Sequence, residues 1–300
     1  MQFCYLILHY KNYEDTVKCI ESIYKTSSDG KIVIVDNGSN DGSGEKLRQQ
    51  YSSERCTILI LEKNLGFSAG NNSGYMWIQE KENPDFIIVA NNDVVFIQKD
   101  FEKKIGDIFL SSNFYVLGPD IYVSKHRDHQ NPLFSKGITI PELQREIEQY
   151  KYYEENPLKF ERRLFAHALK DSLCSHSAII RNVYSKIRGI NCLNYKKEYT
   201  NVGLQGACLI FSKMFLNKET KVFEPEPFLY EEEVFLYYRC IRKNYKMVYS
   251  PNIQVRHEEG ASFSRTSKSN IDKLKFMLRH HVKAREELLE YLKEYGGEDR

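Results

Sequence analysis

The feature that most constrains the fold is a regular alternation of apolar strands and helical stretches over the first 90 residues. Four apolar runs rich in β-branched residues have the length of buried strands: residues 3–8, 31–35, 57–61 and 86–89. Stretches of helical character separate them, at residues 13–24, 44–51 and 70–79. Strands that are apolar throughout must be covered on both faces, which is typical of a mostly parallel sheet between helices. The sequence therefore predicts an α/β protein.

Polar residues and glycines follow each predicted strand where it ends. These segments are His9-Tyr10-Lys11-Asn12, residues 36–42, residues 64–72 and Asn91-Asn92-Asp93. Ligands of parallel sheets bind beyond the carboxyl ends of the strands, where such segments meet on one rim. The rim is the predicted functional site.

Composition excludes some function classes. The 43 Lys and Arg residues nearly cancel the 41 Asp and Glu residues, so the chain has no overall field that would gather nucleic acid. Seven dispersed cysteines lack the spacing of a zinc site or a redox pair, which favours a reducing cytoplasm. The N-terminus does not have the pattern of a signal peptide, and no apolar run is long enough to span a bilayer. Any membrane contact is therefore expected to be peripheral.

The chain is divided by pattern into three parts. We expect a first half at 1–110, a second half at 111–265 with a charged helical insertion at about 141–173, and an amphipathic helical tail at 266–300. The tail has an apolar stripe and a basic first half. The stripe comprises Ile271, Leu274, Leu278, Val282 and Leu289. It could rest on an anionic membrane surface, pack on the catalytic domain or form a homodimer contact.

Asp36 follows the second predicted strand within Asp36-Asn37-Gly38-Ser39. A carboxylate there can accept hydrogen bonds from a uracil-type imide or a ribose hydroxyl. The alternative is a plain turn, with Asp36 as its hydrogen-bond acceptor and Asp41 capping the next helix. For Asp41 the capping role is favoured.

The segment at 64–72 carries Asn64, Gly66, Gly70 and Asn71 at the start of a predicted helix. Small residues allow close approach to a ligand, and a helix N-terminus favours an anionic diphosphate. A strand-to-helix turn without a ligand would have the same pattern.

Asn91-Asn92-Asp93 ends with one carboxylate. Magnesium and manganese ions can be held by a few protein oxygens together with diphosphate oxygens, so Asp93 is a candidate ligand. A hydrophilic turn is the alternative. His257 lies far along the chain, and a neutral imidazole is a plausible Mn²⁺ ligand, although a lone histidine is commonly a surface residue.

Three consecutive glutamates at 231–233 begin a predicted helix. Adjacent carboxylates disfavour each other's ionisation, which raises a pKa towards the range of a general base. The alternative is that the acids only complement the helix dipole. Glu232 shares a helical face with Leu236 and Arg239, whereas Glu233 lies at the helix start.

These five motifs, in this order, resemble the family 2 glycosyltransferases, in particular bacterial rhamnosyltransferase-like enzymes of surface-polysaccharide synthesis. The resemblance covers roughly residues 3–110 and 203–265 and implies a GT-A fold, a Rossmann-like half continuous with an acceptor-binding half. Asn91-Asn92-Asp93 stands where the family carries its D-x-D metal motif, with Asn91 in place of the first aspartate. Residues 230–239 resemble its E-D-x-x-L-x-x-R segment, and residues 257–262 its H-x-x-G-x-S ending.

The resemblance also implies roles. The reaction would be an inverting, metal-dependent transfer from a UDP- or dTDP-sugar to a hydroxyl of a carbohydrate or lipid-linked glycan, assisted by Mg²⁺ or Mn²⁺ on Asp93 and His257. Glu233 would be the catalytic base, with Glu232 as the competing candidate. The acceptor would meet Gly206, Ala207 and Arg239. The nucleotide sugar would meet Tyr10, Asn12, Asp36, Asn37, Asn64, Gly66, Gly70, Asn71, Asn91, Asn92 and Asp93.

Two other functions fit parts of this pattern. Asn91 in place of an acid suggests a non-catalytic protein that binds nucleotide sugar or glycan on the same fold. A nucleotidyltransferase would also begin with a Rossmann-like half, but it normally has a glycine- and arginine-rich loop where this chain has His9-Tyr10-Lys11-Asn12.

Overall fold

The computed structural model describes residues 1–125, 127–163, 193–258 and 270–295. The chain forms two compact units, one of Met1–Leu133 and Asn194–Ser264 and the other of Phe134–Leu193 and Arg265–Arg300. Each unit is described by itself.

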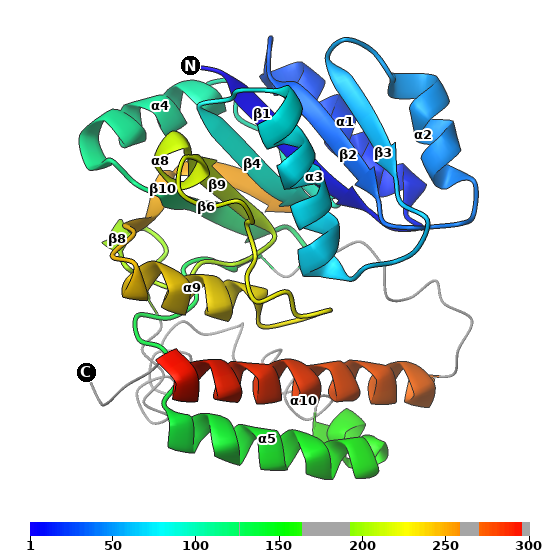
Figure 1. Ribbon diagram of the computed structural model, residues 1–300, viewed down its shortest axis with the longest axis vertical. Helices are drawn as coiled ribbons and strands as arrows, with labels where there is room; N and C mark the ends of the chain where they lie inside the picture. The colour runs from blue at the N-terminus through cyan, green and yellow to red at the C-terminus, as the bar shows by residue number, and fades with distance from the viewer. Residues whose placement is uncertain (126, 164–192, 259–269, 296–300) are drawn as a thin grey trace. The chain divides into compact units, whose positions relative to one another are not determined.

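The first unit is built on the predicted sheet (Figure 1). Its four parallel strands are β1 (Phe3–His9), β2 (Lys31–Asp36), β3 (Cys56–Ile60) and β4 (Phe86–Asn91). The connecting helices are α1 (Tyr13–Thr26), α2 (Ser43–Tyr51) and α3 (Phe67–Lys81). Every element predicted in this region is present, with bounds that differ by up to three residues.

The sheet continues through strands from the second half of the unit. The described strands run in the order β3-β2-β1-β4-β9-β6-β10-β5. The added strands are β5 (Val94–Phe96), β6 (Val116–Val123), β9 (Cys208–Ser212) and β10 (Met247–His257), with β7 (Asp128–His129) on β6 and β8 (Tyr199–Thr200) on β10. Strands β6 and β10 are parallel to each other, whereas β9 is antiparallel to both β4 and β6. The two predicted halves therefore share one sheet.

The sequence interpretation missed several elements of this region, namely β5, β6, α4 (Phe101–Ser112) and the short strands β7 and β8. The sequence predicts a short strand at 246–249, whereas β10 runs from Met247 to His257 across Pro251, and β6 contains Gly118-Pro119. Pro119 pairs with Ser250 where the β10 register shifts before Gln254. A proline is tolerated at such a bulge, so both strands continue past it.

Helices cover both faces of the sheet. Tyr5 and Ile7 of β1 join the core that contains Cys19 and Ile20 of α1. The intervening Leu6 points to the other face, where a Cβ on Gly74 of α3 would lie 2.3 Å from its Cδ1. Helices α8 (Lys213–Leu216) and α9 (Glu232–Arg242) complete the unit (Figure 1).

The carboxyl edge of the sheet brings the polar segments together. Residue His9 pairs with Asp36, and Leu8 with Asn91. The antiparallel strand β9 begins at this edge, where Cys208 pairs with Ala90, and β10 ends at it. The rim predicted from sequence is therefore present.

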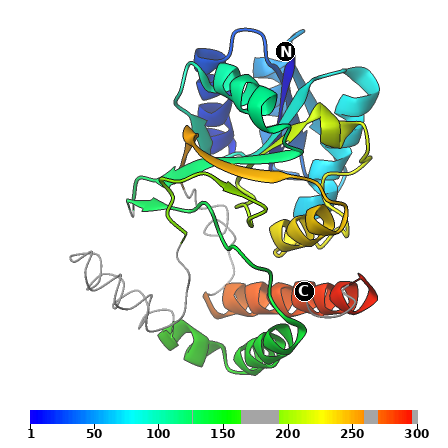
Figure 2. The ribbon, with the colours of Figure 1, turned by 90° about the vertical axis from the view of Figure 1, so that its left-hand side faces the viewer.

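The second unit contains two packed helices, α5 (Ile140–Glu155) and α10 (Asn270–Tyr295), which lie side by side in both views (Figures 1 and 2). A capping box between Thr139 and Glu142 starts α5. Ion pairs join the helices: Arg285 Nε to Glu146 Oε2 at 3.1 Å, and Arg279 Nε to Glu154 Oε1 at 3.0 Å. Helix α5 starts the predicted insertion, whose residues 164–173 lie outside the described part of the chain.

The apolar stripe of the tail has a partner that the sequence did not suggest. Leu278 and Val282 are buried, as are Leu143 and Ile147 of α5. Farther along α10, Leu288 and Leu292 are buried and the predicted Leu289 is only half-buried, because 3.6 residues per turn rotate a stripe over 26 residues. Among the described helices, none is both long and apolar enough to cross a bilayer.

Candidate active site

Asp36 ends β2 and is 2 % exposed. Its Oδ1 accepts hydrogen bonds from the backbone N–H of Ser39 (3.0 Å) and from the Ser39 hydroxyl. The turn geometry considered as an alternative is therefore real, and it fixes the direction of the carboxylate. The other oxygen, Oδ2, lies against Gly44, where a Cβ would be 2.0 Å away.

Gly44 gives a test of the Asp36 position. In Gly44→Ala the added methyl group cannot fit beside Oδ2, so we expect the carboxylate to be displaced and UDP affinity to fall roughly tenfold, about 1.4 kcal/mol. Alanine is the better helix former by up to about 1 kcal/mol, so a loss of affinity cannot be ascribed to a weaker α2. Calorimetric titration with UDP measures the effect, and unchanged affinity would contradict the assignment of Asp36.

Asn37 holds the next loop in place. Its Nδ2 donates to Asn64 Oδ1 (3.1 Å) and Gly66 O (2.9 Å), and its Oδ1 accepts from Leu65 N (2.9 Å). Asn64 Oδ1 also accepts from Gly66 N (2.8 Å). Asn37 was predicted to contact the nucleotide sugar, but these bonds use both its amide nitrogen and its amide oxygen to position the loop; Asn64, also predicted to contact the sugar, takes part through its Oδ1.

The two glycines of this loop make room for protein atoms rather than leaving open space. Gly66 has φ +86°, and a Cβ there would lie 2.5 Å from the carbonyl oxygen of Phe228. At Gly70 a Cβ would lie 2.8 Å from Leu8 Cδ1. Gly66 therefore joins the loop to the segment that leads into α9.

Asn72, which the sequence analysis did not select as a site residue, makes a second link to that segment. Its Nδ2 donates to Phe223 O and to Glu226 Oε1, both at 2.7 Å, and its Oδ1 accepts from Val222 N (2.9 Å) and Phe223 N (3.1 Å). Neighbouring Asn71 donates to Phe67 O (2.9 Å). A buried asparagine with four protein partners is structural, and no sequence pattern distinguishes it from Asn71.

Arg239 corrects a sequence prediction. It was expected to contact the acceptor, but it is 1 % exposed, and its guanidinium donates to the backbone carbonyls of Lys221 and Val222. The side chain has no free surface for a sugar. Its helical face, shared with Leu236, points into the protein, so Arg239 supports the segment that Asn72 also holds.

Asp93 and His257 lie together at the rim. Strand β5 pairs with the end of β10, which brings His257 Nε2 to 3.1 Å from Asp93 Oδ1. The other ring nitrogen, Nδ1, is 2.8 Å from Gln130 Oε1. If a metal ion lay between Nε2 and Asp93, a ring that donates from Nδ1 to the Gln130 carbonyl would offer the ion its Nε2 lone pair, the usual support of a metal-binding histidine; without an ion, Nε2 must carry a proton to bond the carboxylate.

The remaining predicted residues of the rim have defined positions. Asn92 Nδ2 donates to Thr16 Oγ1 (2.9 Å) and to Asn12 O (3.3 Å). The backbone N–H of Asn91 donates to Ala207 O (2.9 Å). Asn12 is buried, whereas Tyr10 is half-buried. No group of three or more His, Cys, Asp or Glu side chains that could hold a metal ion occurs within the described residues.

Two glutamates reach the same rim from α9. A Cβ on Gly206, just before β9, would lie 3.9 Å from Glu232 Oε1 and 3.9 Å from Glu233 Oε2. The next residue, Ala207, accepts a hydrogen bond at its carbonyl oxygen from the backbone N–H of Asn91. Asn91 lies two residues before Asp93. The glutamates and the Asn91 end of the Asn91–Asp93 turn, more than 130 residues apart in sequence, therefore both lie next to the Gly206-Ala207 segment.

The carboxyl of Glu232 has a perturbed pKa. Burial, followed by the charge of Glu233, raises the pKa of the Glu232 carboxyl well above its usual range. Tyr230 and Glu231 just before them have φ angles of +72° and +64°. Non-glycine residues in this region carry strain of order 1–3 kcal/mol each, which is common at functional sites.

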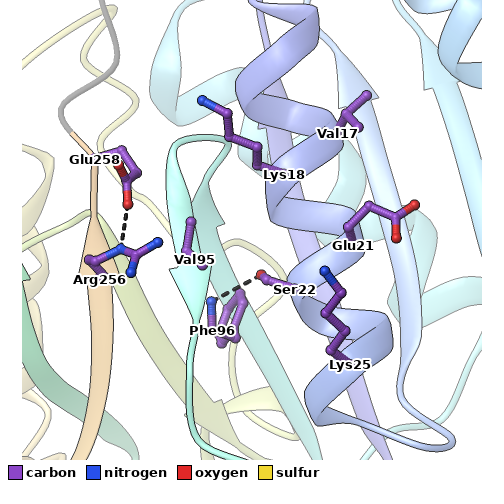
Figure 3. Close-up of a pocket in the computed structure, with 9 residues that line it drawn as sticks. All are labelled: Val17, Lys18, Glu21, Ser22, Lys25, Val95, Phe96, Arg256 and Glu258. Carbon is purple, nitrogen blue, oxygen red and sulfur yellow. Dashed lines mark hydrogen bonds and ion pairs between the residues drawn. The ribbon is translucent and has the colours of Figure 1, made fainter.

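A surface groove of about 530 Å³ lies elsewhere, between α1 and β5 (Figure 3). Its lining includes Lys18, Glu21 and Phe96, with the ion pair of Arg256 and Glu258 at one side. None of the predicted nucleotide-, acceptor- or metal-binding residues lines it.

Comparison with known proteins identifies the family of this chain. The sequence profile named Glycosyl transferase family 2 matches residues 5–187, more than half of the chain. The chain belongs to this family. The matched region contains the nucleotide-side loops and Asp93, whereas Glu232, Glu233 and His257 lie beyond it.

One curated family 2 relative is the low-salt glycan biosynthesis hexosyltransferase Agl10 of Haloferax volcanii, which is 29 % identical over 117 residues. The match covers 39 % of this chain and 35 % of Agl10, so about a third of the relative's length is represented.

Solved structures show the same fold. The crystal structure of S. aureus TarS 1–349 matches with a TM-score of 0.50 and 14 % identity, covering 95 % of this chain and 73 % of TarS 1–349. Its complex with UDP-GlcNAc matches with a TM-score of 0.52 and 13 % identity, covering 95 % and 66 %. The GT-A fold predicted from the family resemblance is therefore confirmed.

Proposed function

We propose that this protein transfers a sugar from a nucleoside diphosphate donor, UDP in the first instance, to a hydroxyl of a glycan acceptor, with inversion. The observation that supports the proposal is that Glu232 and Glu233 lie beside Gly206, while the next residue, Ala207, is bonded to the backbone of Asn91 in the turn that carries Asp93. The hexosyltransferase Agl10 acts in glycan biosynthesis, and TarS was crystallised with UDP-GlcNAc and with UDP, which supports this donor and acceptor class.

Glu233 is the proposed catalytic base. In a single displacement the acceptor oxygen attacks the anomeric carbon, its proton passes to the Glu233 carboxylate, and the bond to the diphosphate oxygen breaks. Burial and the charge of Glu233 raise the pKa of Glu232, which favours the protonated form of Glu232 and leaves Glu233 as the proposed proton acceptor beside Gly206. The neutral Glu232 avoids a second negative charge next to the base.

The carboxylate of Asp93 and the imidazole of His257 form a donor set that fits Mn²⁺ or Mg²⁺ when the diphosphate supplies further oxygens. The ion would offset the charge that develops on the leaving diphosphate. Asp36 is proposed to bind the base or ribose, and Gly206 and Ala207 to leave space for the acceptor.

The alternative is a non-catalytic protein that binds nucleotide sugar. Titration with UDP, with and without Mn²⁺, followed by an assay of UDP release from a panel of UDP-sugars and glycan acceptors, separates the two. Turnover that requires acceptor supports the proposed transferase. Binding without turnover across the panel would support the alternative.

Glu232 also gives a stability prediction. Its raised pKa means that the folded protein binds this proton more tightly than the unfolded chain does. The resulting stabilisation is present below the unfolded-state pKa and is lost as pH rises through the folded-state pKa. Glu232→Gln cannot ionise, so we expect its melting temperature relative to wild type to increase between pH 4 and pH 8. A difference independent of pH would contradict the raised pKa.

We further propose that the enzyme works in the cytoplasm and touches an anionic membrane surface through one end of the second unit. Leu158 and Phe276 are 52 % and 39 % exposed there, beside Lys159, Arg162 and Lys275. Apolar and basic side chains together are typical of peripheral lipid contact. Co-sedimentation with phosphatidylglycerol vesicles should exceed that with phosphatidylcholine vesicles, and no binding to either at low salt would contradict the proposed membrane contact.

A homodimer contact was the other role considered for the apolar stripe of the tail. Analytical ultracentrifugation tests whether the protein forms a homodimer.

A further inference from the structure

His9 is the last residue of β1 and has no exposed surface. Its Nδ1 lies 2.7 Å from Thr16 Oγ1, and its Nε2 lies 2.8 Å from Ser43 Oγ. Burial lowers the pKa of the ring, while the charges of Asp36 and Asp41 oppose that effect. A neutral imidazole has one donor and one acceptor nitrogen, so it can satisfy both hydroxyls at once.

The two hydroxyls belong to different halves of the donor site. Ser43 begins α2, and its Oγ bonds Asp41 Oδ1 at 2.5 Å in the loop that carries Asp36. On the other side, Thr16 Oγ1 accepts from Asn92 Nδ2 (2.9 Å), and Asn92 immediately precedes Asp93. A continuous hydrogen-bonded path, Asp41–Ser43–His9–Thr16–Asn92, therefore connects the nucleotide loop with the metal turn; Asp41 is exposed and the other four residues are buried.

The direction of one bond in this path fixes the direction of the next. Ser43 has one hydroxyl hydrogen. If it is donated to Asp41, His9 must donate from Nε2 and accept at Nδ1, and the Thr16 hydroxyl must turn from Asn12 O to His9. If it is donated to His9, the imidazole donates to Thr16 instead. Such chains polarise cooperatively, so a change at one end is felt at the other.

We propose that His9 is a positioning residue that couples the two ends of the donor site, so that metal binding beside the diphosphate tightens the hold on the nucleoside. A nucleoside diphosphate must contact both ends at once. The inference rests on the proposed donor class, and it assigns a role to a side chain that need not touch the donor.

Two conservative variants separate the two bonds. The amide of asparagine in His9→Asn can occupy the place of Nδ1 and keep the link to Thr16, whereas the longer His9→Gln can occupy the place of Nε2 and keep the link to Ser43. Ser43→Ala breaks the same path outside the ring. If His9 only fills space, each variant should change stability without changing the coupling between metal and nucleotide.

The experiment is calorimetric titration with UDP and with uridine, each with Mn²⁺ and with EDTA. In wild type we expect Mn²⁺ to raise UDP affinity at least about tenfold, within the usual range of coupling between sites. In His9→Asn, His9→Gln and Ser43→Ala this factor should fall below about threefold, while uridine affinity in EDTA changes less than about twofold.

The outcomes are distinct. Wild-type protein that binds no UDP overturns the proposed donor and the coupling with it. Wild-type coupling that persists in the His9 variants, or in Ser43→Ala if those variants do not fold, overturns the role of His9 alone. A loss of uridine affinity equal to the loss of coupling also overturns it, because the variant would then have damaged the nucleoside site itself.

Discussion

Glu233→Gln should lower the turnover number by roughly two to four orders of magnitude, the usual contribution of a general base. The amide keeps the shape of the side chain but cannot accept the acceptor's proton. UDP affinity should stay within about threefold of wild type, because the carboxylate acts on the acceptor and not on the nucleotide. Steady-state UDP release and UDP titration on the same sample provide both measurements.

Glu232→Gln is the matched control. The raised pKa of Glu232 favours its protonated form, and a neutral amide resembles a neutral carboxyl, so we expect a loss of less than about tenfold in turnover. The two variants make the same substitution at neighbouring positions, so they change the composition of the protein equally. A larger loss in Glu232→Gln than in Glu233→Gln would exchange their roles, and near-normal turnover in both would remove the base from α9.

Asp93→Asn should have the second large effect. Removing the carboxylate that lies 3.1 Å from His257 Nε2 leaves the proposed metal site without a charged ligand. We expect the Mn²⁺-dependent gain in UDP affinity to disappear and turnover to fall roughly a thousandfold, about 4 kcal/mol of transition-state stabilisation. UDP binding in EDTA should change little.

Asn91→Asp is the opposite test at the same turn. It restores the acidic residue that the family commonly has two positions earlier, and a second carboxylate should raise Mn²⁺ affinity. The backbone bond of residue 91 to Ala207 O is unaffected by the side chain. If Asp93→Asn retains metal-dependent binding and Asn91→Asp does not increase it, the metal site lies elsewhere.

The sheet was predictable because its first four strands are continuous apolar runs with polar ends. The polar ends also predicted the rim, because the carboxyl ends of parallel strands lie at the same edge of a sheet. Strand β6 could not be found because Gly118-Pro119 interrupts its pattern, and the bulge that accommodates Pro119 depends on β10, which is distant in sequence. The pairing of α5 with α10 was missed for the same reason, because a stripe predicts burial but not the partner.

Only part of the candidate site could be predicted from the sequence. Asp93, His257 and the paired glutamates are visible as charged residues after strands or at a helix start, and they were selected. Asn37, Asn72 and Arg239 have the same residue types as ligand-binding side chains, but they bond other segments of the protein, mostly through backbone groups. His9 was treated as part of a loop, since nothing in sequence marks a ring bonded at both nitrogens.

The central claim is that Asp93 and the α9 glutamates serve one donor site. Anomalous diffraction at the manganese absorption edge, from crystals grown with UDP and Mn²⁺, tests it most directly. The account predicts a manganese peak beside Asp93 and His257, with uridine near Asp36 and the diphosphate directed towards Gly206 and Glu233. Manganese and UDP bound away from Asp93, for example in the groove between α1 and β5, would contradict it.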